Sequence, residues 1–470
     1  KTIRRTSNTG ELMIILGTNS IKDTGFNVAN SCRFDGTSAY LHKSTSSGTN
    51  TKFTFSAWIK RASSGSQYPR ILGSHTDASN YLRLNWNRAV DGEQLHLYSD
   101  GVGTLLTNRF FRDPTAWMHI LVVVDTTDGT ADDRQKIFIN GVQETSFATR
   151  TNPSQNADYN INNASSTLTV GKKSFPDEAS DFFDGYMAEV HYIDGTAYAT
   201  SDFGEYDEDS PQIWKPKKVS GITYGTNGFY LDFKDSSNLG NDANGGTDLT
   251  EVNLAATDQA TDTCTNNFAT GNPLDNYYNA STFSEGNCQI VTGGSTYSWN
   301  TGTIGLSAGK WYWETELDAE SSGGSALFGI ADRPTVSATE ELGGLATTHA
   351  YLSSGNFRTN NTNTSNSVSA TTGDIIGIAL NLDDNEISYY KNNTLIVAAQ
   401  SITATGTGFY FPAWGDWLDP GTVTFKCNFG NPPYANSSDA ADANGYGAFE
   451  YAPPTGYLAI CTKNLGSDGG

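Results

Sequence analysis

The stretch Gly373–Asn393, GDIIGIALNLDDNEISYYKNN, sets the architecture of the C-terminal half of the chain. Its two ends are short runs rich in Ile, Leu and Tyr, and each has the length of a β-strand. Between them, Asp383–Glu386 groups polar residues that are typical of a turn. The stretch therefore predicts two antiparallel strands joined by a tight hairpin turn.

Similar strand-like runs lie on both sides of this hairpin. They are GKWYWETEL at 309–317, LFGIA at 327–331, FYFPAW at 409–414 and CNFGNPPY at 427–434. Such a succession of short strands without a helical period indicates an antiparallel sandwich. In this order the runs resemble a SPRY domain, which implies a concanavalin-A-like sandwich, usually used for binding a partner. We place this second sandwich at residues 266–434.

The first half of the chain shows a comparable series of strands. Phe53–Ile59 and Tyr81–Trp86 alternate with period two, and Ile120–Val124 is a continuous apolar run, typical of a strand buried on both faces. The runs CRFDGTSAYL, FTFSAWIKR, WMHILVVVD, KIFINGV, LTVGKKS and FDGYMAEVHYIDG follow one another between residues 32 and 195. They resemble a laminin-G-like domain of the concanavalin-A-like lectin superfamily. The resemblance implies a jelly roll of two curved sheets over residues 31–204.

The sequence therefore predicts an all-β protein with two concanavalin-A-like jelly-roll β-sandwiches in tandem. A turn-rich linker at 205–265 is expected between them, with one embedded strand at 228–233. Residues 1–30 are expected to form an N-terminal arm, and residues 435–470 a C-terminal tail.

The charge of the chain excludes one class of partner. The formal net charge is −22, from 51 acidic and 29 basic side chains. A polyanion repels phosphate backbones, so no nucleic-acid partner is expected. No apolar run approaches membrane-spanning length, so no membrane insertion is expected. Lys1, Arg4 and Arg5 form a small basic arm, which is either a solvated terminus or an anchor onto an acidic surface.

One group of carboxylates suggests catalysis. Glu316, Asp318 and Glu320 alternate along a predicted strand, which would place them on one face about 6.5 Å apart per two residues. Two carboxylates at such a separation can serve as nucleophile and acid/base in glycoside hydrolysis. The pattern ELDAE also resembles the active-site strand of laminarinase-like and lichenase-like hydrolases. The alternative is that these residues belong to an ordinary SPRY strand that ends at its rim.

A polar loop in the linker suggests a bound cation. It contains the hard oxygen donors that Ca²⁺ takes as ligands, at Asp235, Asn238, Asn241, Asp242 and Asn244. Its spacing does not follow the twelve-residue calcium loop, and Asn, Asp and Gly are also ordinary turn residues. Calcium is thus the one cofactor that the sequence suggests.

Aromatic residues suggest a ligand-binding platform in the second sandwich. Trp414, Asp416 and Trp417 follow a predicted strand in a loop, where tryptophans can stack on sugar rings or anchor an interface. The alternative is that these tryptophans plug the end of the sandwich. A second predicted loop adds Tyr351, Phe357 and Arg358.

The arrangement of the segments carries a third resemblance. The phrases GFYLDFKDSS at 228–237, GNPLDN at 271–276 and YAPPTGYLAICTKNL at 451–465 resemble structural proteins of marine tailed bacteriophages. The resemblance implies a non-enzymatic protein of the virion surface or extracellular space, such as a tail fibre, an appendage or a capsid decoration. Its loops would face a host-surface glycan or a neighbouring subunit.

The expected partners are other virion proteins and further copies of the chain, in a homo-oligomer such as a trimer. Two alternatives remain open. One is a secreted β-glucan hydrolase that uses Glu316 and Glu320, and the other is a filament or surface-layer subunit without glycan affinity.

Overall fold

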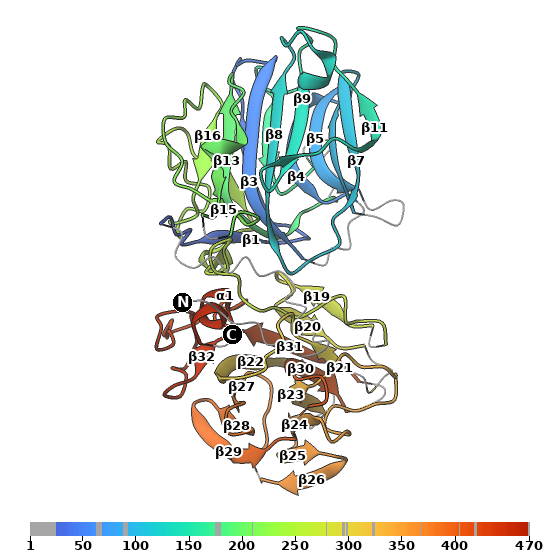
Figure 1. Ribbon diagram of the computed structural model, residues 1–470, viewed down its shortest axis with the longest axis vertical. Coiled ribbons are helices and arrows are strands. Elements are labelled where there is room, and N and C mark those ends of the chain that lie inside the picture. Colours follow the sequence, from blue (N-terminus) through green and yellow to red (C-terminus); the bar gives the residue numbers. More distant parts are fainter. Residues whose placement is uncertain are drawn as a thin grey trace.

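The structure is a computed structural model that describes residues 25–468 apart from 63–67, 88–92, 174–179, 209, 279, 294–296, 298, 322–324, 367, 404 and 418–420. The described chain forms two β-sandwiches stacked along the long axis, the first coloured blue to green and the second yellow to red (Figure 1). The predicted all-β tandem of sandwiches is therefore confirmed. Lys1, Arg4 and Arg5 of the expected arm lie outside the described residues. None of the described helices has the length and apolar character needed to cross a membrane.

One sheet of the first sandwich is built around β3 and β13. Its order is β10-β9-β8-β3-β13-β1-β18, and β16 also pairs with β13. The strands are β1 (Ser31–Asp35), β3 (Lys52–Arg61), β8 (Trp117–Asp125), β9 (Gln135–Ile139), β10 (Val142–Gln143), β13 (Asp184–Asp194), β16 (Phe229–Leu231) and β18 (Gln259–Ala260). β3 and β13 are buried along almost their whole length, because the core covers one side and later segments of the chain cover the other.

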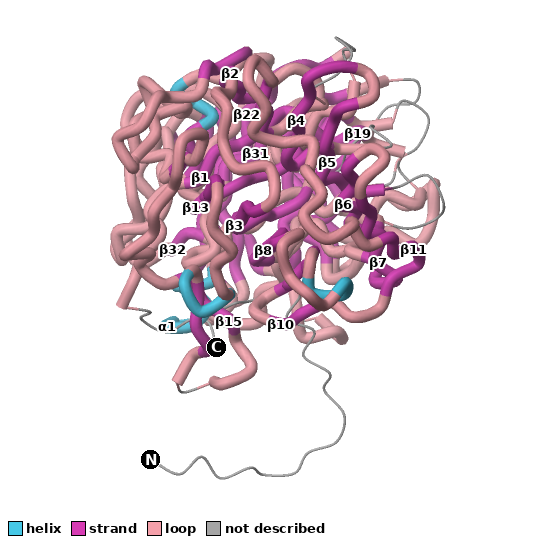
Figure 2. The backbone as a smooth tube through the Cα atoms, turned by 90° about the horizontal axis from the view of Figure 1, so that it is seen from above, coloured by secondary structure: helices cyan, strands magenta, loops and turns pink. Residues whose placement is uncertain are grey.

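The facing sheet has the order β11-β7-β6-β5-β4-β12-β2-β17. Its strands are β2 (Tyr40–Ser44), β4 (Arg70–Asp77), β5 (Asn80–Asn87), β6 (Gln94–Ser99), β7 (Gly103–Phe110), β11 (Phe147–Thr151), β12 (Thr167–Val170) and β17 (Thr250–Val252). The side chains of β5 alternate, so Leu82, Leu84 and Trp86 enter the core between the sheets. Figure 2 shows the two layers from above, with β13, β3 and β8 in one and β4, β5 and β6 in the other.

The segment 205–265 differs from the linker that the sequence predicts. The expected strand is present as β16, but four further strands occur there or at its edge: β14 (Gly204–Tyr206), β15 (Trp214–Pro216), β17 and β18. β16 pairs with β13, β17 with β2 and β18 with β1, so the segment extends both sheets of the first sandwich. Strands of two or three residues are too short to show the alternation that identifies a strand in a sequence.

The second sandwich has the same two-layer construction. Its sheets have the orders β19-β20-β31-β22-β27-β28-β29, with β32 on β22, and β21-β30-β23-β24-β25-β26. The strands of the first sheet are β19 (Thr282–Ser284), β20 (Gln289–Val291), β22 (Lys310–Glu320), β27 (Ile375–Asn381), β28 (Glu386–Lys391), β29 (Thr394–Ser401), β31 (Val423–Asn428) and β32 (Leu458–Ala459). Those of the second are β21 (Trp299–Thr301), β23 (Ala326–Ala331), β24 (Thr348–Leu352), β25 (Asn356–Thr359), β26 (Thr362–Ser365) and β30 (Phe411–Asp416). The predicted hairpin at 373–393 is confirmed as β27 and β28.

The expected C-terminal tail is packed onto the second sandwich. Glu314 of β22 is fully buried, and its carboxylate accepts hydrogen bonds from the backbone N–H groups of Glu450 and Tyr451, at 2.9 and 2.8 Å. The chain then pairs with β22 through β32 and ends in helix α1 (Thr462–Asp468). Short 3₁₀ turns lie at Ala131–Asp133, Thr200–Asp202 and Ala256–Asp258. The tail is thus part of the second sandwich.

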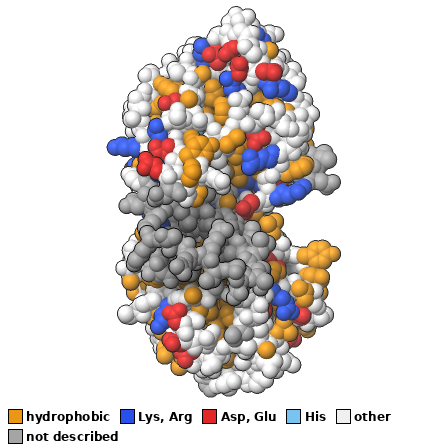
Figure 3. All heavy atoms as spheres, in the orientation of Figure 1, with side chains coloured by type: hydrophobic (Ala, Val, Ile, Leu, Met, Phe, Trp, Pro, Cys, Tyr) orange, Lys and Arg blue, Asp and Glu red, His pale blue; other side chains and the backbone are white. Residues whose placement is uncertain are grey.

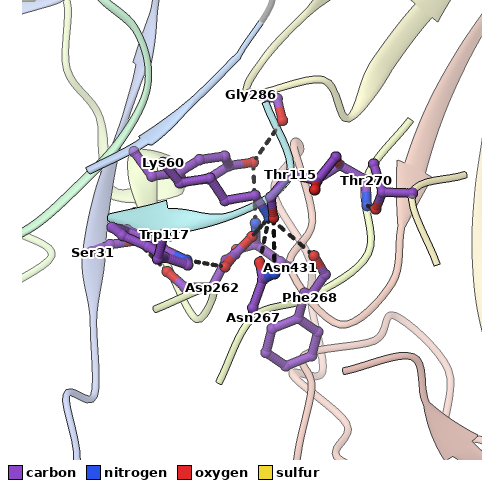
Figure 4. Close-up of polar contacts among 12 residues, drawn as sticks. Ser31, Lys60, Thr115, Trp117, Asp262, Asn267, Phe268, Thr270, Gly286 and Asn431 are labelled. Atoms are coloured by element: carbon purple, nitrogen blue, oxygen red, sulfur yellow. Dashed lines mark hydrogen bonds and ion pairs between the residues drawn. The ribbon is translucent and has the colours of Figure 1, made fainter. Parts of the chain in front are cut away.

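A buried ion pair of the first sandwich lies at the junction with the second, and its lysine also contacts residues that enter the second sandwich (Figure 4). Lys60 of β3 places its Nζ 2.6 Å from Asp262 Oδ2, 2.7 Å from Asn267 Oδ1 and 3.1 Å from the Phe268 carbonyl oxygen. The side chains of Lys60 and Asp262 are 1% and 0% exposed. Trp117 Nε1 donates to the other carboxylate oxygen of Asp262 at 2.8 Å. Both charges are therefore hydrogen-bonded as well as paired, which is what burial of an ion pair requires.

A second buried cation lies in the same interface. Arg33 of β1 donates from Nη1 to the Pro432 carbonyl oxygen at 3.0 Å, and its Nε lies 3.2 Å from Glu285 Oε2. Tyr186 of β13 donates to the Gly286 carbonyl oxygen at 3.1 Å. These contacts reach from one sandwich to loops of the other, so polar groups fix the relative orientation of the two modules.

Replacing Lys60 should weaken the fold strongly. The Lys60→Met variant leaves the Asp262 carboxylate buried without its cation, and we expect the free energy of unfolding to fall by about 3–5 kcal/mol. Chemical denaturation of the full chain measures this change. As a control, Lys234→Met removes an ion pair with Asp232 in which the lysine is 61% exposed, and should change stability by less than about 0.5 kcal/mol.

The Lys60→Met, Asp262→Asn double variant should lose less stability than Lys60→Met alone, because no unpaired charge stays buried. Equal or larger losses in the double variant would show that packing, and not the charge, holds this interface.

Candidate functional site

The second sheet of the first sandwich presents aromatic and basic side chains on its outer side. Tyr81 and Arg83 of β5, and His96 and Tyr98 of β6, are half-buried there, opposite the neighbours that fill the core. Arg70 lies beside them at the start of β4. We call these five residues the β5 face. Aromatic rings and guanidinium groups left partly accessible on a sheet are a common means of binding a ligand.

The β5 face is ordered by contacts among its own residues. The strand register places Arg83 between Gly73 and Tyr98. The Arg83 guanidinium carbon lies 4.5 Å from the centre of the Tyr98 ring, and the rings of Tyr81 and Tyr98 are 5.7 Å apart. The Tyr98 hydroxyl donates to Asp100 at 2.6 Å, which fixes the ring. Gly73 contributes no side chain beside Arg83.

Two arginines bring positive charge to this sheet, half-buried Arg83 and buried Arg70. Arg70 donates from Nη1 to Asn85 Oδ1 at 2.9 Å and lies 3.5 Å from Asp181. Burial, and then the charge of Arg83, lower the pKa of Arg70 to about 10, against the opposite effect of Asp181. Burial and the same two arginines lower the pKa of His96 to about 3, so this imidazole is neutral at physiological pH.

Sequence reasoning missed the β5 face, although one signal was present. The alternation in Tyr81–Trp86 predicts a strand with its polar residues on one side, but charge and aromaticity on one strand do not show which neighbours lie beside it. Only pairing with β4 and β6 brings Arg70, His96 and Tyr98 to Tyr81 and Arg83.

The aromatic platform predicted in the second sandwich is corrected by the structure. Trp414 and Asp416 belong to strand β30 and not to a loop, and both are 0% exposed. Trp414 Nε1 donates to Thr315 Oγ1 at 3.1 Å, and Asp416 accepts from Thr292 Oγ1 at 3.2 Å. Trp414 packs in the core and does not form a loop platform, because its strand faces the interior at that position.

Tyr351 and Phe357 also lie in strands, β24 and β25, and pack in the same core. Arg358, the next residue of β25, points to the opposite side. Its guanidinium lies over the half-buried ring of Trp417, 4.0 Å from the ring centre, and forms an ion pair with Glu341. Of the six predicted residues, the structure thus brings only Arg358 and Trp417 into contact outside the core.

The three candidate catalytic carboxylates do not share one face. Asp318 pairs with Lys426 at 2.7 Å, and half-buried Glu316 lies opposite Lys426 in the sheet register. A shift of register between Leu317 and Ala319 then reverses the alternation. Glu320 accepts hydrogen bonds at 2.6–2.8 Å from Ser353 and from N–H groups at the start of β23, in the facing sheet. A bulge is the physical reason why the predicted arrangement was wrong.

In the predicted calcium loop, one carboxylate oxygen each of Asp235 and Asp242 accepts hydrogen bonds that close turns. Asp235 accepts hydrogen bonds from the backbone and hydroxyl of Ser237, and Asp242 Oδ1 accepts from Tyr230 N and Asn244 N. The Asn238 side chain donates a hydrogen bond to Asp248. The backbone N–H of Asn241 donates to the carbonyl oxygen of Asn238 and closes a turn. In the part of the chain that the structure describes, no three His, Cys, Asp or Glu residues are grouped to hold a metal. Asp242 Oδ2 has no hydrogen-bond partner among the described residues, and calcium binding by this loop stays a prediction.

Ser56 and His119, buried on the other sheet, resemble a nucleophile with its general base. The protonation of the His119 ring excludes this role. Trp214 Nε1 donates to His119 Nδ1 at 3.1 Å, and an indole can only donate. Nδ1 therefore carries no proton, and Nε2 must donate to Ser56 Oγ, 2.8 Å away. Burial lowers the pKa of His119 to about 3. The imidazole is thus neutral and cannot take a proton from Ser56 through Nε2.

Glu189 lies near this pair at a second irregularity of the sheet. It has a φ of +48°, at a shift in the β13–β3 register between Ala188 and His191. Tyr230 donates to its carboxylate at 2.8 Å, and His191 Nε2 lies 3.9 Å away. Burial, opposed by the Tyr230 hydrogen bond and by Lys234, raises the pKa of Glu189 to about 7. The small cavity beside these residues has no room for a water molecule, so it cannot hold a substrate.

The raised pKa of Glu189 predicts a pH dependence of stability. Between its ordinary pKa of about 4.5 and the folded value of about 7, the unfolded chain releases the proton while the folded chain keeps it. This contribution is present at low pH and is lost as pH rises, by up to about 3 kcal/mol. Glu189→Gln should remove it, so denaturation from pH 4 to 8 should show a smaller fall with pH in the variant. Glu205→Gln, at an exposed position, should leave the wild-type slope; equal slopes in all three proteins would contradict the assignment.

Comparisons with known proteins agree with the two modules. Residues 35–205 match the family model of the concanavalin A-like lectin/glucanases superfamily, and residues 310–431 match that of the SPRY domain. A search of curated proteins finds no match.

Among solved structures, the chain is similar to the SPRY domain of human HERC1, with 16% identity, a TM-score of 0.25 and coverage of 30% of this chain and 86% of that one. It is also similar to a putative carbohydrate binding protein from Bacteroides ovatus, with 15% identity, a TM-score of 0.34 and coverage of 49% and 61%. On the family models and the fold, the chain carries a concanavalin A-like jelly-roll module followed by a SPRY module.

Proposed function

We propose that this protein is a non-enzymatic binding protein whose first sandwich holds a glycan on the β5 face. The observation that carries the proposal is the placement of half-buried Tyr81 and Tyr98 beside Arg83 on the outer side of a sheet. Tyrosine rings offer an apolar face to a sugar ring, and the guanidinium donates hydrogen bonds to its oxygens. The match of residues 35–205 to a lectin and glucanase superfamily supports this role.

The absence of catalytic activity is part of this proposal. Among the described residues, the side chains of Glu316 and Glu320 lie on opposite faces of β22. The His119 ring carries its proton on the nitrogen that faces Ser56 and therefore cannot act as its base. These placements favour binding over hydrolysis.

We further propose that the protein acts at a virion surface, as an appendage or decoration that attaches to a host glycan and assembles with its own copies. The three segments that resemble phage structural proteins, at 228–237, 271–276 and 451–465, support this setting. The buried Lys60 contacts support it too, because a rigid pair of modules can carry a binding face at a fixed distance from its attachment. In this arrangement the SPRY module contacts the neighbouring subunit.

Removing one ring of the β5 face should weaken glycan binding. In Tyr81→Ala, loss of a stacking contact of about 1–2 kcal/mol should raise the dissociation constant about tenfold. An immobilised-glycan array with the full chain identifies the ligand, and titration of that ligand gives the constant. Tyr277→Ala is the matched control, because this tyrosine of the second module is 89% exposed and lies outside the β5 face.

Equal binding by Tyr81→Ala and wild type would remove the β5 face from the proposal. A blank array for the wild-type protein would favour a purely structural subunit whose surfaces serve contacts between copies.

A further inference from the structure

The charge of the β5 face differs from that of the chain as a whole. The protein has 51 acidic and 29 basic side chains. On the view in Figure 3, acidic and basic side chains are interspersed over the first sandwich, without an extended area of one sign. The β5 face instead brings Arg83 close enough to Arg70 for its charge to lower the pKa of Arg70. Such crowding persists in a folded protein when surrounding contacts hold it, and it is typical of functional sites.

Arg83 is the cation of this pair with unused hydrogen-bonding capacity. Arg70 already has Asn85 and Asp181 as partners. Arg83 stacks on Tyr98, and its buried Nε has no hydrogen-bond partner among the described residues. None of the carboxylates that the structure describes forms an ion pair with Arg83. The Nη groups of this half-exposed side chain therefore remain as donors for an acceptor that is not part of the described chain.

The neighbours of Arg83 favour an anion over a neutral acceptor. His96 and Asn85 lie next to it across β5 and β6 and bring no negative charge, while Arg70 adds a second positive charge. Asp100, which directly follows β6, accepts a hydrogen bond from the Tyr98 hydroxyl. A planar guanidinium binds carboxylate and sulfate groups through two parallel hydrogen bonds, which gives both strength and orientation.

We propose that the β5 face binds an acidic glycan, with Arg83 holding a carboxylate or sulfate group and the Tyr81 and Tyr98 rings packing against the sugar that carries it. This inference rests on the proposed function and names the class of its ligand. Arg70 supports the site from the side through its positive charge. Because the rest of the chain is acidic, long-range repulsion opposes a polyanion, and contact with Arg83 has to supply the selectivity.

The test measures binding of the full chain to three kinds of polysaccharide by isothermal titration calorimetry. Polygalacturonate supplies carboxylates, dextran sulfate supplies sulfates, and dextran and laminarin are neutral. The buffer contains about 0.5 M NaCl, which shortens the Debye length to a few ångströms and so screens the net charge of the chain. We expect binding to at least one acidic polymer and at least tenfold weaker binding to the neutral ones.

Arg83→Met keeps the length of the side chain and removes the guanidinium, and should weaken binding to the acidic polymer at least tenfold. Arg83→Lys keeps the positive charge without the planar set of donors. Its affinity for the acidic polymer should lie between those of the wild type and Arg83→Met. Arg109→Met is the matched control, since this arginine of the same sandwich is 52% exposed and already paired with Glu144. Unchanged melting temperatures of the variants show that they are folded.

The outcomes separate this inference from the proposed function. Binding of neutral glycans that needs Tyr81 but not Arg83 would overturn the acidic ligand and keep the β5 face. Failure to bind any polysaccharide would overturn both. Preference for polygalacturonate or for dextran sulfate identifies the anionic group, and either preference supports the inference when it disappears in Arg83→Met.

Discussion

The burial of the Lys60 ammonium group at the junction is the constraint on which the arrangement of the two sandwiches depends. Burying a single charge costs several kcal/mol, so Lys60 and Asp262 each need all of their partners at once. Lys60 finds them in Asp262, Asn267 and the Phe268 carbonyl, and Asp262 finds a further one in Trp117. These partners come from the first sandwich and from the chain that enters the second. A change of orientation between the modules would take Asn267 and the Phe268 carbonyl away from the buried Lys60 ammonium group.

The same part of the chain explains why one face of the first sandwich is available for binding. The segment before the junction returns over the sheet of β3 and β13, where Phe203, Trp214 and Tyr224 pack on its outer side. That sheet is therefore buried on both sides, and its polar residues, such as His119, become part of a second interior. The facing sheet keeps its outer side half-exposed at Tyr81 and Arg83. The fold thus assigns a structural role to one sheet and leaves the other to bind.

Local irregularities of the strands decide the chemistry of both sheets. The register shift in β22 sends Glu320 to the facing sheet, where it closes a turn and does not join Glu316. The register shift in β13 places Glu189 at a buried position, and burial raises the pKa of its carboxyl group. In each case one extra residue changes which side of the sheet a carboxylate reaches, and with it the environment that sets its charge.

The sequence by itself determined the class of the fold, the two modules and the hairpin at 373–393, because a period of two and the composition of turns are local properties. It also showed β5 as an alternating strand. Only the tertiary structure decided which alternate residues meet. The residues around Trp414 have the composition of a binding loop, but they form strand β30, and the Trp414 side chain lies in the core. Arg83 becomes a site because β4 and β6 place Gly73 and Tyr98 beside it, with Arg70 opposite Asn85. Such pairings between distant strands depend on packing of the whole sandwich, not on any single segment.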